Sequence, residues 1–345
     1  MIWLVWRQHR QQALFALLGL AALAAFLVPT GIQMHDAFER AGLPGCLRAA
    51  ASVEYVQVVN GADQAPDPVS TCQDLAAQFA GRFGSRGAIG ILLWFLPLFV
   101  GLFWGAPLIA RELEHGTHRL VWTQGVSRRR WALAKFGLVG GGVVLLTACY
   151  ALLVTWWRAP LDQTTAQRFD LLLFDLEGLV PIGYALFALA LGVFAGALTR
   201  RTQAAMAVTL VGFLAVRLLV ELLARPRFLT PLRRTFPVAG TAAPNGLTGD
   251  WVIKAGVYDA DGGRLAGRVF GNYSQSVCGV PADAPASDPT LERCLAEFGR
   301  GAYNLELFHP ASRYWLFQGL ETALFLVLAA ALLLAAVLWV RRRIT

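Results

Sequence analysis

Six long apolar stretches dominate what this 345-residue chain can fold into. Each is long enough to cross the ~30 Å hydrocarbon layer of a membrane as a helix that rises ~1.5 Å per residue. Hydrophobic residues make up 56% of the chain, whereas ~45–50% is usual for a soluble domain. The sequence therefore predicts an all-α membrane protein with six transmembrane helices. They lie at about residues 13–34, 87–110, 136–157, 178–199, 204–224 and 314–340.

Basic residues predict the orientation of these helices. If the N-terminus is cytoplasmic, the inside segments are 1–12, 111–135, 200–203 and 341–345, with 13 Arg and Lys against two acidic residues. The outside segments are much longer, yet they hold 16 basic and 18 acidic residues. Cytoplasmic loops carry the basic surplus in membrane proteins, so both ends are predicted to be cytoplasmic. The net charge of +8 then needs no nucleic-acid partner.

Two outside segments, at about 35–86 and 225–313, are too long to be turns. The second contains strand-like pieces at 250–258 and 264–273, separated by a turn-forming run. We predict that both segments form small extracytoplasmic lobes.

Four of the five cysteines lie in these lobes. Cys46 and Cys72 are in the first lobe, and Cys278 and Cys294 are in the second. Even numbers on the oxidising side of a membrane favour disulfides. Bonds Cys46–Cys72 and Cys278–Cys294 are the simplest pairing, although four cysteines allow three. Cys149, inside the third span, is expected to be free.

The loop between the second and third spans is the most informative segment. Apolar Leu113, Leu120 and Trp122 recur there at roughly helical spacing among charges, which indicates an amphipathic helix. Ser127 is a good N-cap for the third span. Arg128–Arg130 then occupy the first turn, where the helix dipole disfavours cations. These cations anchor the loop to the membrane face, form a contact surface for a cytoplasmic partner, or do both.

Several short elements in and beside this loop follow a pattern known from one family. They are Trp6-Arg7-Gln8-His9-Arg10, Glu114-x-Gly116-Thr117, Thr123, Val126-Ser127-Arg128, Trp131, Lys135 and the run from His309 to Trp315. In these elements the chain resembles the permease subunit of an ABC-2-type transporter of bacteria. Gly125 departs from the pattern, because many members of that family have proline there.

The resemblance implies a mechanical role. Permeases of this kind bind a separate cytoplasmic ABC ATPase through a coupling helix between the second and third spans. In this chain the docking residues would be Glu112, Glu114, Gly116, Thr117, Arg119, Thr123, Ser127 and Arg128. The chain has no G-x-x-x-x-G-K-[ST] phosphate loop. It is therefore expected to be no enzyme and to bind no cofactor, with ATP and Mg²⁺ held by the ATPase.

Six spans are half a transporter in that family, so the resemblance implies a second permease chain. It also implies that the protein lies in the bacterial plasma membrane and that the transporter exports its substrate. The corresponding divisions of the chain are a first span with its interfacial segment (1–34), a lobe (35–86), four spans with the coupling loop 111–135 (87–224), a second lobe (225–313), and a last span with a basic tail (314–345).

Three ionisable residues lie inside the spans, where charges are costly and are usually paired or functional. Arg217 and Glu221 are one helical turn apart in the fifth span, and Glu321 is near the start of the sixth. We predict that Arg217 forms an ion pair with Glu221 or Glu321 near the outer surface. A structural clamp is favoured over a contact with substrate.

Glycine pairs at i, i+4 allow two helices to approach closely. They occur at Gly101 and Gly105, at Gly137 and Gly141, and at Gly192 and Gly196. Packing is the default interpretation of all three, and dimerisation is the weaker alternative.

Other functions have less support. His115 and His118 lack a clear third ligand, so no metal site is expected. No H-E-x-x-H or G-x-S-x-G motif supports an intramembrane protease. A non-transporting receptor or anchor whose lobes bind a ligand stays open as the alternative.

Overall fold

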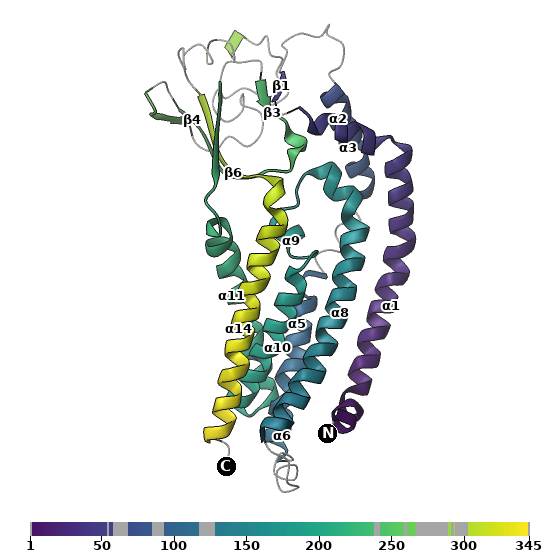
Figure 1. Cartoon of the computed structure of the whole chain (residues 1–345), viewed down its shortest axis with the longest axis vertical. Helices are drawn as coiled ribbons and strands as arrows, with labels where there is room; N and C mark the ends of the chain where they lie inside the picture. The colour runs from purple at the N-terminus through teal and green to yellow at the C-terminus, as the bar shows by residue number, and fades with distance from the viewer. Residues whose placement is uncertain are drawn as a thin grey trace.

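The computed structural model describes residues 2–53, 55–57, 68–84, 93–116, 128–237, 242–258, 261–266, 289–290, 293 and 303–343. Six helices within them are long and apolar enough to cross a membrane, which confirms the six predicted spans. These are His9–Arg40, Leu96–Glu114, Lys135–Thr165, Val180–Thr199, Thr202–Arg227 and Ala311–Val340. The first helix begins, and the last helix ends, at the end of the bundle opposite the β-strands, so both termini lie there (Figure 1).

Two of the helices are longer than predicted. Helices α1 (Ile2–Arg40) and α8 (Arg128–Thr165) lie side by side and run past the predicted ends of their spans at 34 and 157. In α8 the continuation carries an i, i+4 ion pair from Arg158 to Asp162, with a distance of 2.7 Å. The length of an apolar stretch therefore predicted where each span ends, but not where its helix ends.

Helix α10 (Val180–Thr199) is the centre of the bundle, and the second span packs closely against it. That span consists of α5 (Leu96–Val100), the π-helical turn η2 (Gly101–Gly105) and α6 (Ala106–Glu114). A Cβ atom added to Gly192 of α10 would lie 2.5 Å from the backbone nitrogen of Ala106.

The glycine pairs therefore differ in role. A Cβ on Gly101 would lie 2.8 Å from the carbonyl oxygen of Ala188, and Gly105 and Gly196 are equally restricted. Gly101-Gly105 and Gly192-Gly196 thus let the second and fourth spans touch, as predicted. Gly137 and Gly141 have no atom of the described chain within 4 Å of such a Cβ.

The remaining membrane helices complete the bundle around α10. Helix α11 (Thr202–Leu219) continues through a π-helical turn, η3 (Val220–Ala224), and a 3-10 turn, η4 (Arg225–Arg227). Helix α14 (Tyr314–Arg343) follows the short turn η6 (Ala311–Arg313) and packs along α10.

The described part of the first predicted outside segment is mainly helical, with one short strand. Helices α2 (Leu43–Ala51) and α3 (Pro68–Phe83) pack together and are joined by the Cys46–Cys72 disulfide, which confirms that pairing. Cys149 is free. Cys278 and Cys294 lie outside the described residues, so their bond stays a prediction.

The second of these outside segments contains β-structure, as its strand-like pieces predicted, so the all-α class describes the spans and not the segments outside them. An antiparallel sheet has the order β2-β6-β4-β5. Its strands are Leu232–Pro237 (β2), Trp251–Tyr258 (β4), Arg264–Ala266 (β5) and Tyr303–His309 (β6). The strand-like piece predicted at 250–258 corresponds to β4, and the one predicted at 264–273 corresponds to β5 over 264–266, while 267–273 lie outside the described residues.

The two outer segments also touch one another. Strand β1 (Tyr55–Gln57) pairs with β3 (Ala242–Pro244). Beyond β3, the buried Asn245 side chain donates hydrogen bonds to the carbonyl oxygens of Ala50 (2.8 Å) and Val53 (3.0 Å). The turn η5 (Gly246–Thr248) follows it.

Candidate functional site

The first candidate site is the end of α6, where the predicted coupling loop begins. The Lys135 ammonium donates a hydrogen bond to Oε1 of Glu112 at 2.5 Å, and the Lys135 side chain is 3% exposed. Glu112 lies in the last turn of the second span and Lys135 begins the third, so this ion pair joins the two sides of the loop. Losing one partner of such a buried pair leaves the other charge uncompensated.

Glu114 makes a second connection, to the fifth span. Its Oε2 accepts hydrogen bonds from the backbone nitrogen of Thr202 (3.1 Å) and from the Thr202 hydroxyl (2.8 Å). Thr202 is the first residue of α11, where backbone N–H groups have no partner within the helix. An acidic side chain from another helix therefore caps α11.

The rest of the predicted docking surface is only partly described. Gly116 has a φ of +68°, a left-handed conformation that glycine adopts readily just after a helix. Helix α8 begins at Arg128. Thr117, Arg119, Thr123 and Ser127 lie outside the described residues, so their role stays a prediction.

The second candidate site is a buried ionic network near the end of the bundle that carries the β-strands, which is the end predicted to face outward and is called the outer end below. Arg217 donates hydrogen bonds from Nε (3.0 Å) and Nη2 (2.8 Å) to Oδ2 of Asp175, and from Nη1 to the carbonyl oxygen of Trp94 (3.0 Å). The predicted ion pair of Arg217 with Glu221 or Glu321 is therefore wrong.

Glu321 is paired with a different arginine, Arg225. Arg225 Nε donates a hydrogen bond to Oε2 of Glu321 at 2.7 Å, and Arg225 Nη2 donates one to Oδ1 of Asp175 at 2.5 Å. Glu221 lies 3.8 Å from the same guanidinium. The hydroxyl of Tyr184 hydrogen bonds to Asp175 at 3.0 Å and also to Glu321. Network residues from four chain segments are thus held together.

Part of this network was visible in the sequence. Arg217, Glu221 and Arg225 recur at i, i+4 and i+8, so they share one face of a helix. Asp175 was missed because it lies in a connecting segment that gives no sign of burial.

A single side chain helps to position that segment. Gln318 of α14 donates a hydrogen bond to the carbonyl oxygen of Phe174 at 2.9 Å. Its Oε1 accepts from the backbone nitrogens of Leu179 (2.9 Å) and Val180 (3.0 Å). The short helix α9 (Leu171–Phe174) and the following turn are thereby fixed against α14, with Asp175 facing inward.

A further buried carboxyl lies beside the network. Glu177 accepts a hydrogen bond from the Tyr314 hydroxyl at 2.8 Å and is 3.9 Å from Arg168. Burial, together with the nearby Asp162 carboxylate, raises the pKa of Glu177 to about 8. This carboxyl is therefore protonated over most of the neutral range.

The geometry of the outer site favours a clamp. Asp175, Arg217, Arg225, Glu221 and Glu321 are all at most 3% exposed. Both arginines pair with carboxylates and lie over aromatic rings of the chain itself, although neither oxygen of Glu221 has a hydrogen-bond partner among the described residues. Charges that satisfy one another in this way hold segments together rather than bind a substrate from solution.

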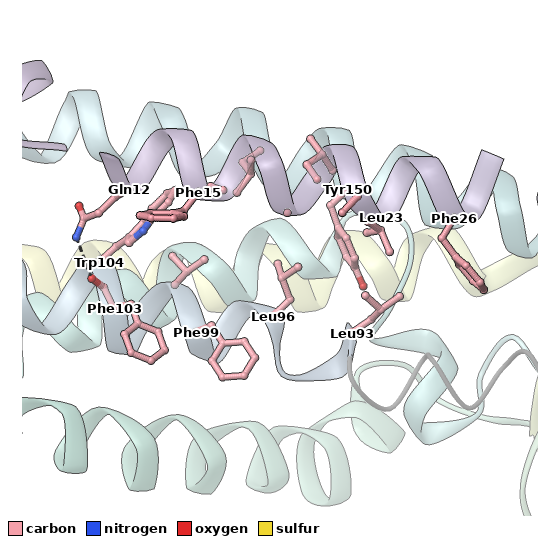
Figure 2. Close-up of a pocket in the computed structure, with 16 residues that line it drawn as sticks. Gln12, Phe15, Leu23, Phe26, Leu93, Leu96, Phe99, Phe103, Trp104 and Tyr150 are labelled. Atoms are coloured by element: carbon pink, nitrogen blue, oxygen red, sulfur yellow. Dashed lines mark hydrogen bonds between the residues drawn. The ribbon is translucent and has the colours of Figure 1, made fainter. Parts of the chain in front are cut away.

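The third feature is a groove of about 810 Å³ between α1, the second span and α8. Figure 2 shows Phe15, Leu23 and Tyr150 facing Leu96, Phe99 and Trp104 across it. Its lining is almost wholly apolar.

A membrane-transporter family model matches this arrangement of spans. Residues 17–225 match the model described as ABC-2 membrane transporter related. The chain belongs to this family. The match runs from α1 to the start of η4, so it includes five of the six spans and Asp175, Arg217 and Arg225 of the network.

Membership of the ABC-2 family identifies the chain as an ABC-2-type permease, a multi-pass membrane protein. Glu112 and Glu114 lie within the matched region, whereas the sheet and α14 follow it. No curated protein and no solved structure matched the chain.

Proposed function

We propose that this permease is one membrane-spanning half of an ATP-driven exporter, powered by a separate cytoplasmic ATPase that docks on the loop 111–135. Both ends of the chain are then cytoplasmic, as the distribution of basic residues favours. The observation that carries the proposal is the pair of connections at the end of α6. The Glu112–Lys135 ion pair and the Glu114–Thr202 cap join three spans where the loop begins.

These connections give the loop mechanical leverage. A force on the loop acts on α6 and α8 together, because Glu112 and Lys135 pair across its ends. It also acts on α11 through Glu114. A loop that only anchored the chain to lipid headgroups would need no contact with a third span.

The proposal also includes a second permease chain, because transporters of this family are built from two permease halves. A second copy, or a related permease, would supply the other half, and each half would carry one ATPase. ATP and Mg²⁺ would be bound by those ATPases. The buried outer network then holds α10, α11 and α14 of each half together while the half moves.

The test separates charge from capping at Glu114. Glu114→Gln keeps an oxygen that can cap Thr202 but removes the charge, and Glu114→Arg reverses the charge. Thr202→Val removes only one hydrogen bond to Glu114 and keeps its charge. We expect both Glu114 variants to lose the ATPase on purification from native membranes, since truncating a charged interface contact costs ~2–5 kcal/mol. Thr202→Val should keep it.

The readouts are ATPase co-purification and ATP hydrolysis by the purified complex. Normal assembly and hydrolysis with Glu114→Arg would reject docking through this residue. Loss with Thr202→Val but not with Glu114→Gln would assign Glu114 to capping alone.

A further inference from the structure

The groove between α1, the second span and α8 contains one polar group that its apolar lining does not satisfy. Tyr150 is 2% exposed, and its hydroxyl has no hydrogen-bond partner among the described residues. Figure 2 shows the ring extending from α8 between α1 and the second span, with the hydroxyl at its tip near Leu93. The rest of the side chain is held by apolar neighbours such as Leu27 and Val154.

The position of Tyr150 makes this hydroxyl unusual. Tyr150 lies within the predicted third span, 136–157, so its ring is placed inside the hydrocarbon layer. Water is absent at that depth, and polar groups there are normally satisfied within the protein. The acyl chains of bulk lipid would fill the groove but offer no acceptor to the hydroxyl.

The opposite wall of the groove has an irregular backbone. The π-helical turn η2 (Gly101–Gly105) lies there, and Phe103 within it is 55% exposed. The Phe103 carbonyl accepts a hydrogen bond from the Gln12 side chain of α1 at 3.3 Å. Single π-helical turns inside helices are frequent at functional sites.

We propose that this groove binds a lipophilic ligand with a carbonyl acceptor inside an apolar body, and that the Tyr150 hydroxyl donates a hydrogen bond to that carbonyl. Its volume of about 810 Å³ lies within the ~300–1,000 Å³ usual for small-molecule sites. Phe15, Phe99 and Trp104 supply flat apolar surface for the ligand. The inference rests on the proposed function, because such a ligand is the substrate class that the permease would take from the bilayer.

A transmembrane helix of a second copy fits the groove less well. The backbone carbonyls of such a helix are already used in its own hydrogen bonds. Only a side chain could then reach Tyr150, whereas a carbonyl compound brings the acceptor with it.

The experiment uses the full chain in lipid nanodiscs without any ATPase. The probe is 4-octylbenzophenone, whose ketone accepts a hydrogen bond and also cross-links on illumination. The matched competitor is 4-octyldiphenylmethane, which has no acceptor. Peptide mapping follows labelling of residues 93–104 and 146–150 as the probe concentration rises.

We expect saturable labelling of these peptides in the wild type. Tyr150→Phe should raise the half-saturating concentration of the ketone two- to tenfold, the range for one net hydrogen bond, and leave the competition by the diphenylmethane unchanged. Ala22→Trp, which fills the groove, should weaken both compounds. Val211→Trp, on the 67% exposed face of α11, should weaken neither.

Three results would overturn the proposal. The first is equal labelling of the wild type and Tyr150→Phe. The second is labelling spread over lipid-facing residues and unaffected by Ala22→Trp. The third is labelling that appears only when copies of the chain dissociate, which would place a second copy in the groove. None of these bears on the ATPase docking test at Glu114, so the two proposals fail separately.

Discussion

Helices α10 and α1 are both apolar membrane helices, but the chain packs them in opposite ways. In an apolar 18-residue window of α10, 67% of the residues are buried in the protein, whereas in the corresponding window of α1 only 6% are. α10 contacts the second, third, fifth and sixth spans, and α1 packs mainly along α8. Apolar character alone does not decide packing in a membrane, because lipid tails are as apolar as leucine.

What distinguishes the two helices is close contact and polar pairing. α10 has glycines that admit the backbone of the second span and lies beside the buried network. α1 exposes large side chains such as Phe15 (72%) and Leu17 (58%) and borders the groove. From this contrast we expect the contacts around α10 to supply most of the stability of the bundle, and the groove beside α1 to be available for a ligand. Three predictions test this assignment.

The largest effect is expected at Arg225, in the network beside α10. Arg225→Leu leaves Glu321 buried without its guanidinium partner and removes one of the two arginines that pair with Asp175, which should cost ~3–5 kcal/mol of unfolding free energy. Thermal unfolding in detergent measures it. The control is Arg40→Ala at the end of α1. Arg40 pairs with Asp36 at 3.8 Å, and both side chains are largely exposed, so this variant should change the unfolding free energy little.

A neutral pair of substitutions refines this test. Arg225→Leu with Glu321→Leu should recover part of the loss, because fewer charges stay buried unpaired. If Arg225→Leu unfolds at the temperature of the parent, the clamp is not what stabilises the core.

The next effect is steric. Gly192→Ala puts a methyl group against the backbone of Ala106, so the second and fourth spans must separate, at a cost of ~1–3 kcal/mol. Gly141→Ala, in the same type of glycine pair on α8, meets no described atom and should be neutral or slightly stabilising. Melting temperatures of the two variants in the same detergent decide the comparison. Equal losses would mean that the α8 glycines are also packed, for instance by a second chain.

The smallest effect is a pH dependence at Glu177, between α9 and α10. Its pKa is raised to about 8 in the folded chain, so folding favours the protonated form. The stabilising contribution is complete below the ordinary pKa near 4.5 and is lost as pH rises toward 8. Unfolding free energy should fall by about 1 kcal/mol per pH unit between pH 6 and pH 8.

Glu177→Gln should flatten this slope, because the amide does not titrate. Glu39→Gln, at an exposed carboxylate of α1, should keep it. A slope that survives Glu177→Gln unchanged would assign the titration to another group.

The sequence predicted features that depend on local pattern. The six spans follow from apolar length, the Cys46–Cys72 bond from two cysteines in one outer segment, and β4 from its alternation and flanking turns. The partner of Arg217 could not be predicted in this way. Asp175 is far away along the chain and is brought inward by Gln318, which itself lies on the last span.

Two strands of the four-stranded sheet, β2 and β6, were not predicted, for a similar reason. Strands β2 and β6 pair with each other across a long stretch of sequence, and neither forms a strong isolated pattern. The docking role of the loop also stays a prediction where its residues lie outside the described chain.

The pairing of β2 with β6 has a mechanical consequence for the helices attached to them. β2 follows the outer end of α11 and η4, and β6 leads through η6 into α14, so the sheet ties the outer ends of the two helices together. Arg234 of β2 reinforces the tie through Glu306 of β6, at 2.7 Å. Relative rotation of the helices must then pivot about this end. The 30 residues of α14 form a lever of about 45 Å, at ~1.5 Å per residue, so a rotation of about 6° moves its far end by about 5 Å.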